Sequence, residues 1–149
     1  MEFKSWLKRF VLEHGLLISW LIAFTATLGS LYFSEIVGFI PCEYCWYQRI
    51  LMYPLAVILA IATVRKDIRV YVYVLPLSIS GGSISLFHYL NQKVTFLHEL
   101  GAACGPIPCN IEYINWFGFV TIPFMALVAF ILVTIIHLSL YYVQRSENK

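Results

Sequence analysis

Four cysteines, spaced as two close pairs, are the residues of this 149-residue chain with the clearest potential for chemistry. Cys42 and Cys45 are separated by two residues, and Cys104 and Cys109 by four. A disulfide within so short a ring closes little of the unfolded chain, so it adds little stability. The short ring does keep the partner thiol close when the bond is made and broken repeatedly. The spacing therefore favours redox chemistry over a structural role.

Two other interpretations of the cysteines stay open at this point. The pairs could bridge each other across two loops and only clamp them together. Four thiolates could also form a tetrahedral zinc site. The long separation between the pairs is unlike that of compact zinc modules, and we expect no bound metal.

The residues around the first pair indicate a reactive thiol. Pro41 disfavours helix at the residue before it, so the next helix should begin within the pair and place Cys45 in its first turn. A helix N-terminus favours thiolate over thiol. Gln48 and Arg49 lie three and four residues beyond Cys45, on the same helix face, and Arg49 would stabilise the thiolate further. An interfacial anchor is the alternative role for Arg49, and it would not require that shared face.

The elements that position these residues are predicted to be membrane helices. The chain is 60% hydrophobic and 12% charged, with a mean hydropathy of +0.78, whereas soluble domains carry roughly 25% charged residues. A net charge of +2 on so apolar a chain argues against a nucleic-acid partner. Runs without Asp, Glu, Lys or Arg cover residues 14–34, 50–64, 70–92 and 113–144.

A bilayer core needs about 20 apolar residues in a helix, so each run can supply one span, the second by extension back to residue 46. We therefore predict an all-α integral membrane protein, a single domain over 1–149 built as an antiparallel bundle of four transmembrane helices. The expected spans are about 14–34, 46–64, 70–91 and 119–142. Two outer loops, about 35–45 and 92–118, would then carry the cysteines.

The basic residues predict the orientation of the bundle. All but two of the ten Lys and Arg residues fall on the side that holds both termini and the 65–69 loop. The positive-inside rule makes this side cytoplasmic, so all four cysteines face the oxidising outer side. The first apolar run is too long for a signal peptide and no Ala-x-Ala site follows it, so we expect it to remain as a span.

A reactive thiol at the membrane boundary needs an electron acceptor. A quinone is a membrane-soluble two-electron acceptor, with a flat apolar ring and two carbonyl oxygens. Gln48 and Arg49 could donate hydrogen bonds to such an oxygen. His88, near the outer end of the third span, could be a second polar contact or a proton donor, or only a structural residue. His14 and His137 lie near the cytoplasmic ends and receive no role.

The second pair looks accessible. Gly105, Pro106 and Pro108 resist helix and strand, so we expect an extended, exposed turn. A thioredoxin-like partner could grip such a turn before thiol exchange. Apolar residues at helical spacing over 94–100 suggest a short helix on the outer surface just before it.

Residues 41–49, Pro-Cys-Glu-Tyr-Cys-Trp-Tyr-Gln-Arg, closely resemble the C-x-x-C-x-x-Q-R signature of the DsbB disulfide-generating membrane proteins. Four spans and a second cysteine pair in the second outer loop extend the resemblance over nearly the whole chain. The short spacing from Cys104 to Cys109 resembles the Bacillus-type branch, called BdbC; the best-studied members have a much longer loop there. A protein similar to vitamin K epoxide reductase is the alternative, but the Gln-Arg directly after the C-x-x-C favours the DsbB family.

The resemblance implies a relay of electrons. A reduced thioredoxin-like thiol oxidase, similar to DsbA or BdbD, would attack the Cys104–Cys109 disulfide at Cys104. Cys109 would pass the electrons to Cys42, and Cys45 would react with a quinone, either menaquinone or ubiquinone. Arg49 matches the quinone-side Arg of the family. The resemblance also implies a bacterial plasma membrane, with membrane lipid around the bundle, and we expect a monomer.

Overall fold

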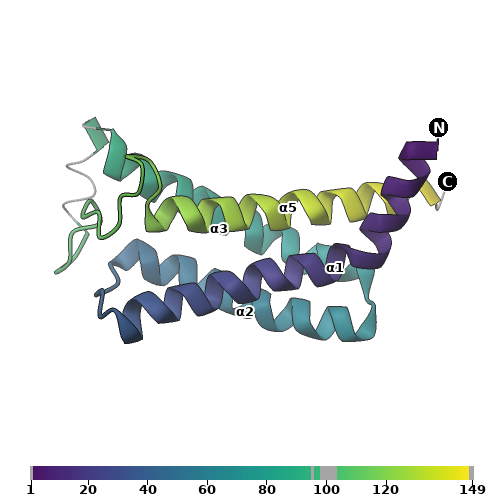
Figure 1. Cartoon of the computed structure of the whole chain (residues 1–149), viewed down its shortest axis with the longest axis horizontal. Helices are drawn as coiled ribbons and strands as arrows, with labels where there is room; N and C mark the ends of the chain where they lie inside the picture. The colour runs from purple at the N-terminus through teal and green to yellow at the C-terminus, as the bar shows by residue number, and fades with distance from the viewer. Residues whose placement is uncertain (1, 95, 98–103, 148–149) are drawn as a thin grey trace.

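Residues 2–94, 96–97 and 104–147 are described by the computed structural model, and their long elements are all helices (Figure 1). Helix α1 (Glu2–Leu31) continues into a π-helical turn, η1 (Tyr32–Ile36), and is followed by α2 (Glu43–Arg65), a short 3₁₀ turn η2 (Ile68–Val70), α3 (Tyr71–Lys93) and α5 (Ile122–Glu147). Four of these segments are long and apolar enough to cross a membrane: Lys8–Ile36, Glu43–Arg65, Ile68–Lys93 and Ile122–Ser146. The prediction of an all-α membrane protein with four spanning helices is confirmed.

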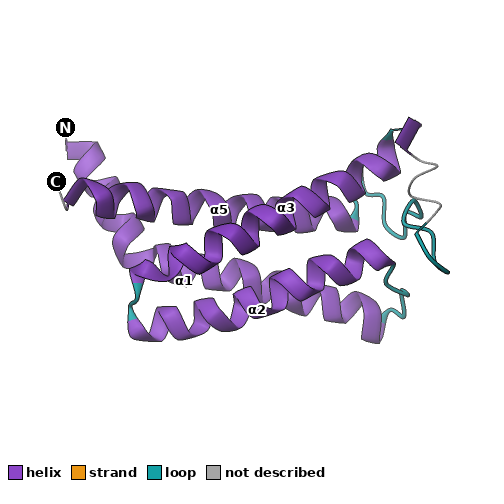
Figure 2. Ribbon diagram, turned by 180° about the vertical axis from the view of Figure 1, so that it is seen from behind, coloured by secondary structure: helices purple, strands orange, loops and turns teal. Residues whose placement is uncertain are grey.

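The four helices form a closed antiparallel bundle. α1 and α3 each pack against both α2 and α5. Both termini lie at one end of the bundle with the turn between α2 and α3 (Figures 1 and 2). The α1–α2 loop and the segment 104–121 lie at the other end. The two cysteine-bearing segments therefore meet at one end, opposite the termini.

α2 and α3 lie within a few residues of the predicted spans 46–64 and 70–91, whereas α1 and α5 begin at other residues than the predicted first and fourth spans. α1 begins well before residue 14. Residues 2–13 mix charged and apolar side chains, and helical hydrogen bonding does not require an uninterrupted apolar run; Arg9 and Glu13 pair there at 3.9 Å. α5 begins at Ile122 and not near 119. Phe117 and Gly118 just before it have positive φ angles of 56° and 82°, which a right-handed helix cannot include.

An ion pair and an aromatic stack are among the contacts that hold the segment 104–121 against the rest of the bundle. Lys93, at the end of α3, forms an ion pair of 2.8 Å with Glu112. The ring of Tyr113 stacks on Phe39 of the α1–α2 loop, with 4.8 Å between centroids. The surface helix expected over 94–100 lies largely outside the described residues, although Phe96 and Leu97 are helical.

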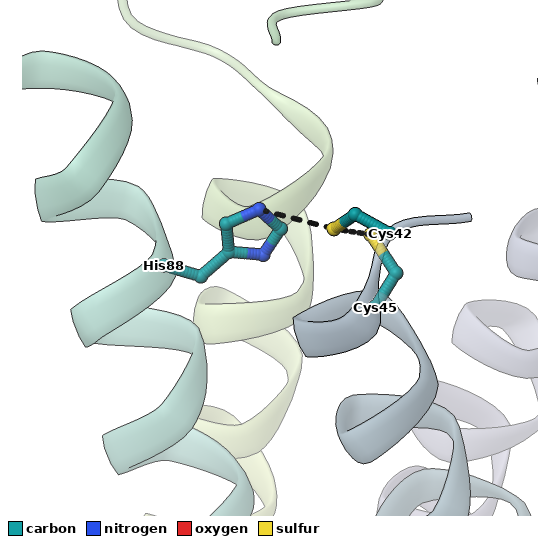
Figure 3. A group of neighbouring side chains, drawn as sticks. All are labelled: Cys42, Cys45 and His88. Atoms are coloured by element: carbon teal, nitrogen blue, oxygen red, sulfur yellow. Dashed lines mark hydrogen bonds between the residues drawn. The ribbon is translucent and has the colours of Figure 1, made fainter. Parts of the chain in front are cut away.

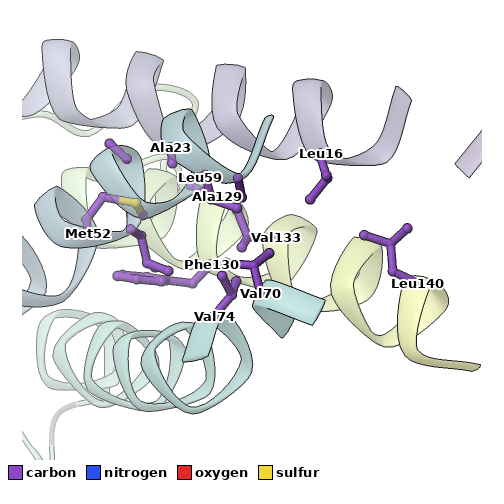
Figure 4. Close-up of a cluster of buried hydrophobic side chains, with 13 residues drawn as sticks. Leu16, Ala23, Met52, Leu59, Val70, Val74, Ala129, Phe130, Val133 and Leu140 are labelled. Carbon is purple, nitrogen blue, oxygen red and sulfur yellow. The ribbon is translucent and has the colours of Figure 1, made fainter. Parts of the chain in front are cut away.

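The core of the bundle centres on the fully buried side chain of Phe130 on α5 (Figure 4). Its ring packs directly on α3 at Gly81: a Cβ added to Gly81 would overlap the edge of the Phe130 ring. The absence of a side chain at this position is what allows α3 and α5 to approach so closely.

Replacing Gly81 with Ala is expected to lower the free energy of unfolding by about 1–3 kcal/mol, because the new methyl group must displace the Phe130 ring. Gly82→Ala is the matched control. Its Cβ would lie 3.6 Å from Phe130 Cβ, an ordinary contact, and alanine favours a helix by up to about 1 kcal/mol over glycine. Unfolding of the two variants in detergent measures the difference. Equal losses at both positions would contradict the close packing.

Candidate active site

The first cysteine pair lies at the N-terminus of α2. Cys42 has extended backbone angles (φ −72°, ψ 174°) and caps the helix, which begins at Glu43 and places Cys45 in its first turn. The helix therefore begins within the pair, as predicted. All four cysteines are free thiols, and Cys42 Sγ donates a hydrogen bond to Cys45 Sγ at 3.1 Å. The two sulfurs are close enough to form a disulfide after a small rotation of the side chains.

The second cysteine pair lies against the first. Cys104 and Cys109 are only 6% and 1% exposed, and they form one buried cluster with Cys42. The side chain of Cys109 interacts with both Cys42 and Cys104, and the Tyr44 hydroxyl interacts with Cys104. The two pairs, predicted in separate loops, thus form a single group of thiols.

The prediction of an extended, exposed turn between Cys104 and Cys109 is only partly right. Gly105 and Pro106 are exposed. The backbone is a turn and not an extended strand, and both thiols point inward. The glycine and prolines of this segment predict a rigid turn. The burial of the two sulfurs could not be predicted from the segment itself, because the residues that cover them lie on α2 and α3.

His88 joins the two cysteine pairs from α3. Its Nε2 lies 3.6 Å from Cys42 Sγ (Figure 3) and 3.0 Å from the carbonyl oxygen of Cys109. Its Nδ1 lies 2.9 Å from Gln48 Nε2. A Gln48 amide that donates to Nδ1 leaves the ring proton on Nε2, where it is donated to the carbonyl. His88 is 1% exposed, so its ring position is fixed from both sides.

Arg49 points away from His88, toward α1. Its Nε donates to Ser30 Oγ at 2.9 Å and its Nη2 to the Ser30 carbonyl at 3.1 Å. Tyr53 donates to the same hydroxyl at 3.3 Å. The guanidinium also lies 5.3 Å from the centre of the Trp46 ring. These contacts hold the cation at one place on the inner face of α2, and Arg49 still interacts electrostatically with Cys45.

A cavity of about 670 Å³ lies between α1, α2 and α5. Its walls are mostly apolar, and Cys45, Gln48 and Arg49 border it together. Phe33, Phe39 and Tyr113 also border it. Small-molecule sites in proteins typically have volumes of 300–1,000 Å³, apolar walls and a few convergent polar groups. The structure thus brings Cys45, Gln48 and Arg49 to one cavity. His88, predicted as a further polar contact for the same ligand, does not border this cavity and lies beside Cys42 instead.

The surroundings of Cys42 and Cys109 keep both thiols protonated. The hydrogen bond to Cys45, together with burial, raises the pKa of Cys42 to about 12. Burial and the contact with Cys104 raise the pKa of Cys109. Cys42 is therefore the proton donor of its pair, and Cys45 is the acceptor that borders the cavity.

The raised pKa of Cys42 predicts slow alkylation. At pH 8 we expect Cys42 in the reduced protein to react with iodoacetamide on the order of a hundredfold more slowly than a free thiol of pKa about 8.5. The thiolate fraction is lower by about three orders of magnitude, and the greater nucleophilicity of a more basic thiolate offsets about one of them. The rate should rise as the pH approaches 12. Cys45→Ala removes the hydrogen-bond acceptor and should speed the reaction of Cys42 at pH 8. Peptide-level mass spectrometry measures both rates; an unchanged rate in Cys45→Ala would contradict the role of the hydrogen bond.

The residues of α1 and α5 that line the cavity were not predicted from the sequence. Ser30, which holds Arg49, and Ala126 and Ala129 of α5 were not among the predicted site residues. Ser30 carried a weak signal, since it is a polar residue within an apolar run. The alanines carried none, because small apolar residues are common on any face of a membrane helix.

The fold and the thiol cluster define a membrane-embedded protein equipped for thiol chemistry, and the comparisons identify its family. The family model "Disulfide bond formation protein DsbB" matches residues 13–140. The chain is 58% identical to the Disulfide bond formation protein C of Bacillus subtilis, over 87% of this chain and 93% of that protein. It is 57% identical to the Probable disulfide formation protein C 1 of Bacillus anthracis, over 83% and 88%. A Coxiella burnetii relative, a Probable disulfide formation protein, is 38% identical over 90% and 92%. No solved structure matches the chain significantly.

The chain belongs to the DsbB family of disulfide bond formation proteins. It is therefore a membrane oxidoreductase that generates disulfides. The resemblance noted from residues 41–49 is confirmed, as is its extension to the Bacillus-type branch.

Proposed function

We propose that the chain oxidises an extracytoplasmic thioredoxin-like protein and passes the electrons to a quinone bound in the cavity between α1, α2 and α5. The observation that carries the proposal is the position of Cys45, which borders this cavity together with Gln48 and Arg49. The size of the cavity suits a flat ring with part of an apolar tail. A bound quinone would supply an acceptor for two electrons and two protons.

Gln48 and Arg49 hold the polar end of the proposed ligand. Arg49 has five N–H donors, of which two are directed at Ser30, so others can donate to a carbonyl oxygen. A fixed guanidinium also stabilises negative charge that develops on that oxygen. The apolar walls exclude water and so strengthen this interaction. Cys45 is the thiol placed to deliver electrons here.

On the other side of Cys45, the thiol cluster supplies the electrons. A thiolate of the partner attacks the Cys104–Cys109 disulfide at Cys104, which releases Cys109 and forms a mixed disulfide. A second partner thiolate resolves it and leaves with the disulfide. Cys109 next attacks the Cys42–Cys45 disulfide at Cys42, its neighbour in the buried cluster. Closure of Cys104 onto Cys109 then leaves Cys42 and Cys45 as the reduced pair.

We also propose that the thiol cluster faces the outside of a bacterial plasma membrane and that both termini are cytoplasmic. The distribution of Lys and Arg supports this orientation, and thiol oxidation requires it, because disulfides persist on the oxidising side. We further propose that the protein works as a monomer surrounded by lipid, since the cavity and the thiols all come from one chain.

Trapping the thiols of all four cysteines in native membranes, with and without quinone, tests the proposal. We expect both pairs to be oxidised when quinone is present and reduced when the membranes lack it. The reduced partner should become oxidised only in the first case. Cysteines whose redox state does not respond to quinone would overturn the proposal and favour a clamp between the loops. Labelling from outside intact cells, with a reagent that cannot cross the membrane, tests the orientation in the same samples.

A further inference from the structure

The sulfurs of Cys42 and Cys45 form a compact cluster with a ring nitrogen of His88. The proposed electron relay uses the two thiols but does not require an imidazole nitrogen so close to them. The two Sγ atoms and a ring nitrogen all lie within 4.8 Å of one another (Figure 3). The Cys42 sulfur lies 3.1 Å from Cys45 Sγ and 3.6 Å from His88 Nε2. Two thiols and an imidazole at such distances are a set of ligands that zinc prefers.

The distances are close to those of a tetrahedral zinc site. With Zn–S bonds of about 2.3 Å and Zn–N bonds of about 2.0 Å, neighbouring ligand atoms in a tetrahedron lie roughly 3.5–3.8 Å apart. The separation from Cys42 to His88 already fits. The two sulfurs, now 3.1 Å apart, need to separate by about 0.7 Å to reach the tetrahedral spacing, which a rotation of the Cys45 side chain provides.

A small cavity of about 20 Å³ lies directly beside the three residues and is lined by all of them. Gln92 and Thr121 line the same cavity. Gln92 Oε1 and Thr121 Oγ1 are buried without a hydrogen-bond partner. A volume of this size holds one water molecule. A water bound to the metal in this cavity would be the fourth ligand. It would donate hydrogen bonds to these two oxygens, which would hold it in place.

We propose that the reduced chain binds one Zn²⁺ through Cys42 Sγ, Cys45 Sγ and His88 Nε2, and that the bound ion reversibly blocks oxidation of the pair. Binding releases the two thiol protons and changes no oxidation state. Both sulfurs then donate their electron pairs to the metal, so neither can attack or be attacked. The oxidised pair does not bind the ion, because a disulfide offers no thiolate. Zinc is therefore an inhibitor of this site and not a resident cofactor.

Gln48 controls the ring nitrogen that faces the metal. In the reduced, metal-free protein its amide donates to Nδ1. A half-turn of that amide presents its oxygen instead. The oxygen accepts a hydrogen bond from Nδ1–H, which stabilises the tautomer with the ring proton on Nδ1 and leaves the lone pair of Nε2 free for the metal. A carboxylate at this position would do the same without the half-turn, as in the carboxylate–histidine–zinc arrangement. Gln48→Glu should therefore bind zinc about tenfold more tightly, and Gln48→Leu about tenfold more weakly.

Anaerobic titration of the full chain in detergent, reduced and freed of reductant, tests the site directly. We expect one Zn²⁺ per reduced chain, measured by competition with a chromogenic chelator, and no binding after the pair is oxidised. Co²⁺ as the probe should give thiolate charge-transfer absorption and the visible bands of a tetrahedral site. His88→Ala should weaken binding on the order of a hundredfold. The exposed His14→Ala is the matched control and should change nothing.

Three outcomes overturn the proposal. The first is no binding by the reduced chain at micromolar Zn²⁺, and the second is equal affinity in His88→Ala and the parent. The third is loss of binding in Cys104→Ser/Cys109→Ser, which would assign the ion to a site of four cysteines. If His88→Ala fails to fold, the zinc affinity of Gln48→Glu is the alternative test. An affinity equal to that of the parent chain would overturn the role of His88 as a ligand. These binding measurements do not depend on the proposed quinone reaction, so the two proposals can fail separately.

Discussion

Cys45→Ser is expected to abolish quinone-dependent oxidation of a reduced thioredoxin-like partner, with turnover falling by about three orders of magnitude or more. Cys45 is the thiol that borders the large cavity, and Cys42 Sγ lies 3.1 Å from its sulfur. A serine oxygen cannot form the disulfide, so electrons that reach Cys42 have no route onward. Initial rates of partner oxidation in the purified protein, with added quinone, measure the effect.

The stability of the same variant separates a catalytic from a clamping role. Serine differs from cysteine by one atom, and the four-helix core lies away from this position, so the free energy of unfolding should change by less than about 1 kcal/mol. A clamp between the loops predicts the reverse, a clear loss of stability with no loss of turnover. Retention of turnover in Cys45→Ser would remove this cysteine from the reaction.

Gly29→Phe is expected to raise the apparent KM for quinone at least tenfold, which corresponds to about 1.4 kcal/mol of binding. Gly29 borders the large cavity beside Ser30, and no atom lies within 4 Å of a Cβ built on it. A phenyl ring at this position can therefore occupy the polar end of the cavity without displacing the core. Steady-state kinetics at saturating partner concentration measure the change.

Leu28→Phe is the matched control for Gly29→Phe. The neighbouring residue is half exposed on the outer face of α1 and does not border the cavity, so the same ring should leave KM within about twofold. Gly29→Ala adds only a methyl group and should also have little effect. An unchanged KM in Gly29→Phe, with normal unfolding, would place the quinone elsewhere.

Much of the fold and part of the site could be predicted because the relevant signals are local. Runs of apolar residues predict the four helices directly, since a bilayer requires about 20 such residues for each span. Pro41 and the spacing of Cys45, Gln48 and Arg49 predict which residues share the first turns of α2. The cavity is bordered by all three, although the roles proposed for them stay predictions.

The contacts between helices could not be predicted in the same way. In a soluble protein the apolar stripe of a helix indicates the face that packs inward, but these helices are apolar on every side. The rotation of α3 that turns His88 toward Cys42 and Cys109 therefore leaves no clear periodicity in the sequence. The pairing of Ser30 with Arg49 and the approach of Gly81 to Phe130 likewise depend on packing between distant segments.

The Cys42–Cys45 pair lies between an apolar cavity on one side and the buried cluster of thiols on the other. Cys45 borders the large cavity formed by α1, α2 and α5, whereas Cys42 lies with His88 and Cys109 on the side of α3. If the proposed quinone and the proposed protein partner bind at these two places, they do not touch each other, so the partner is protected from direct reaction with the electrophilic ring. They would also not compete for one surface. Initial-rate plots at several fixed quinone concentrations should therefore be parallel lines, the kinetic pattern of a ping-pong enzyme.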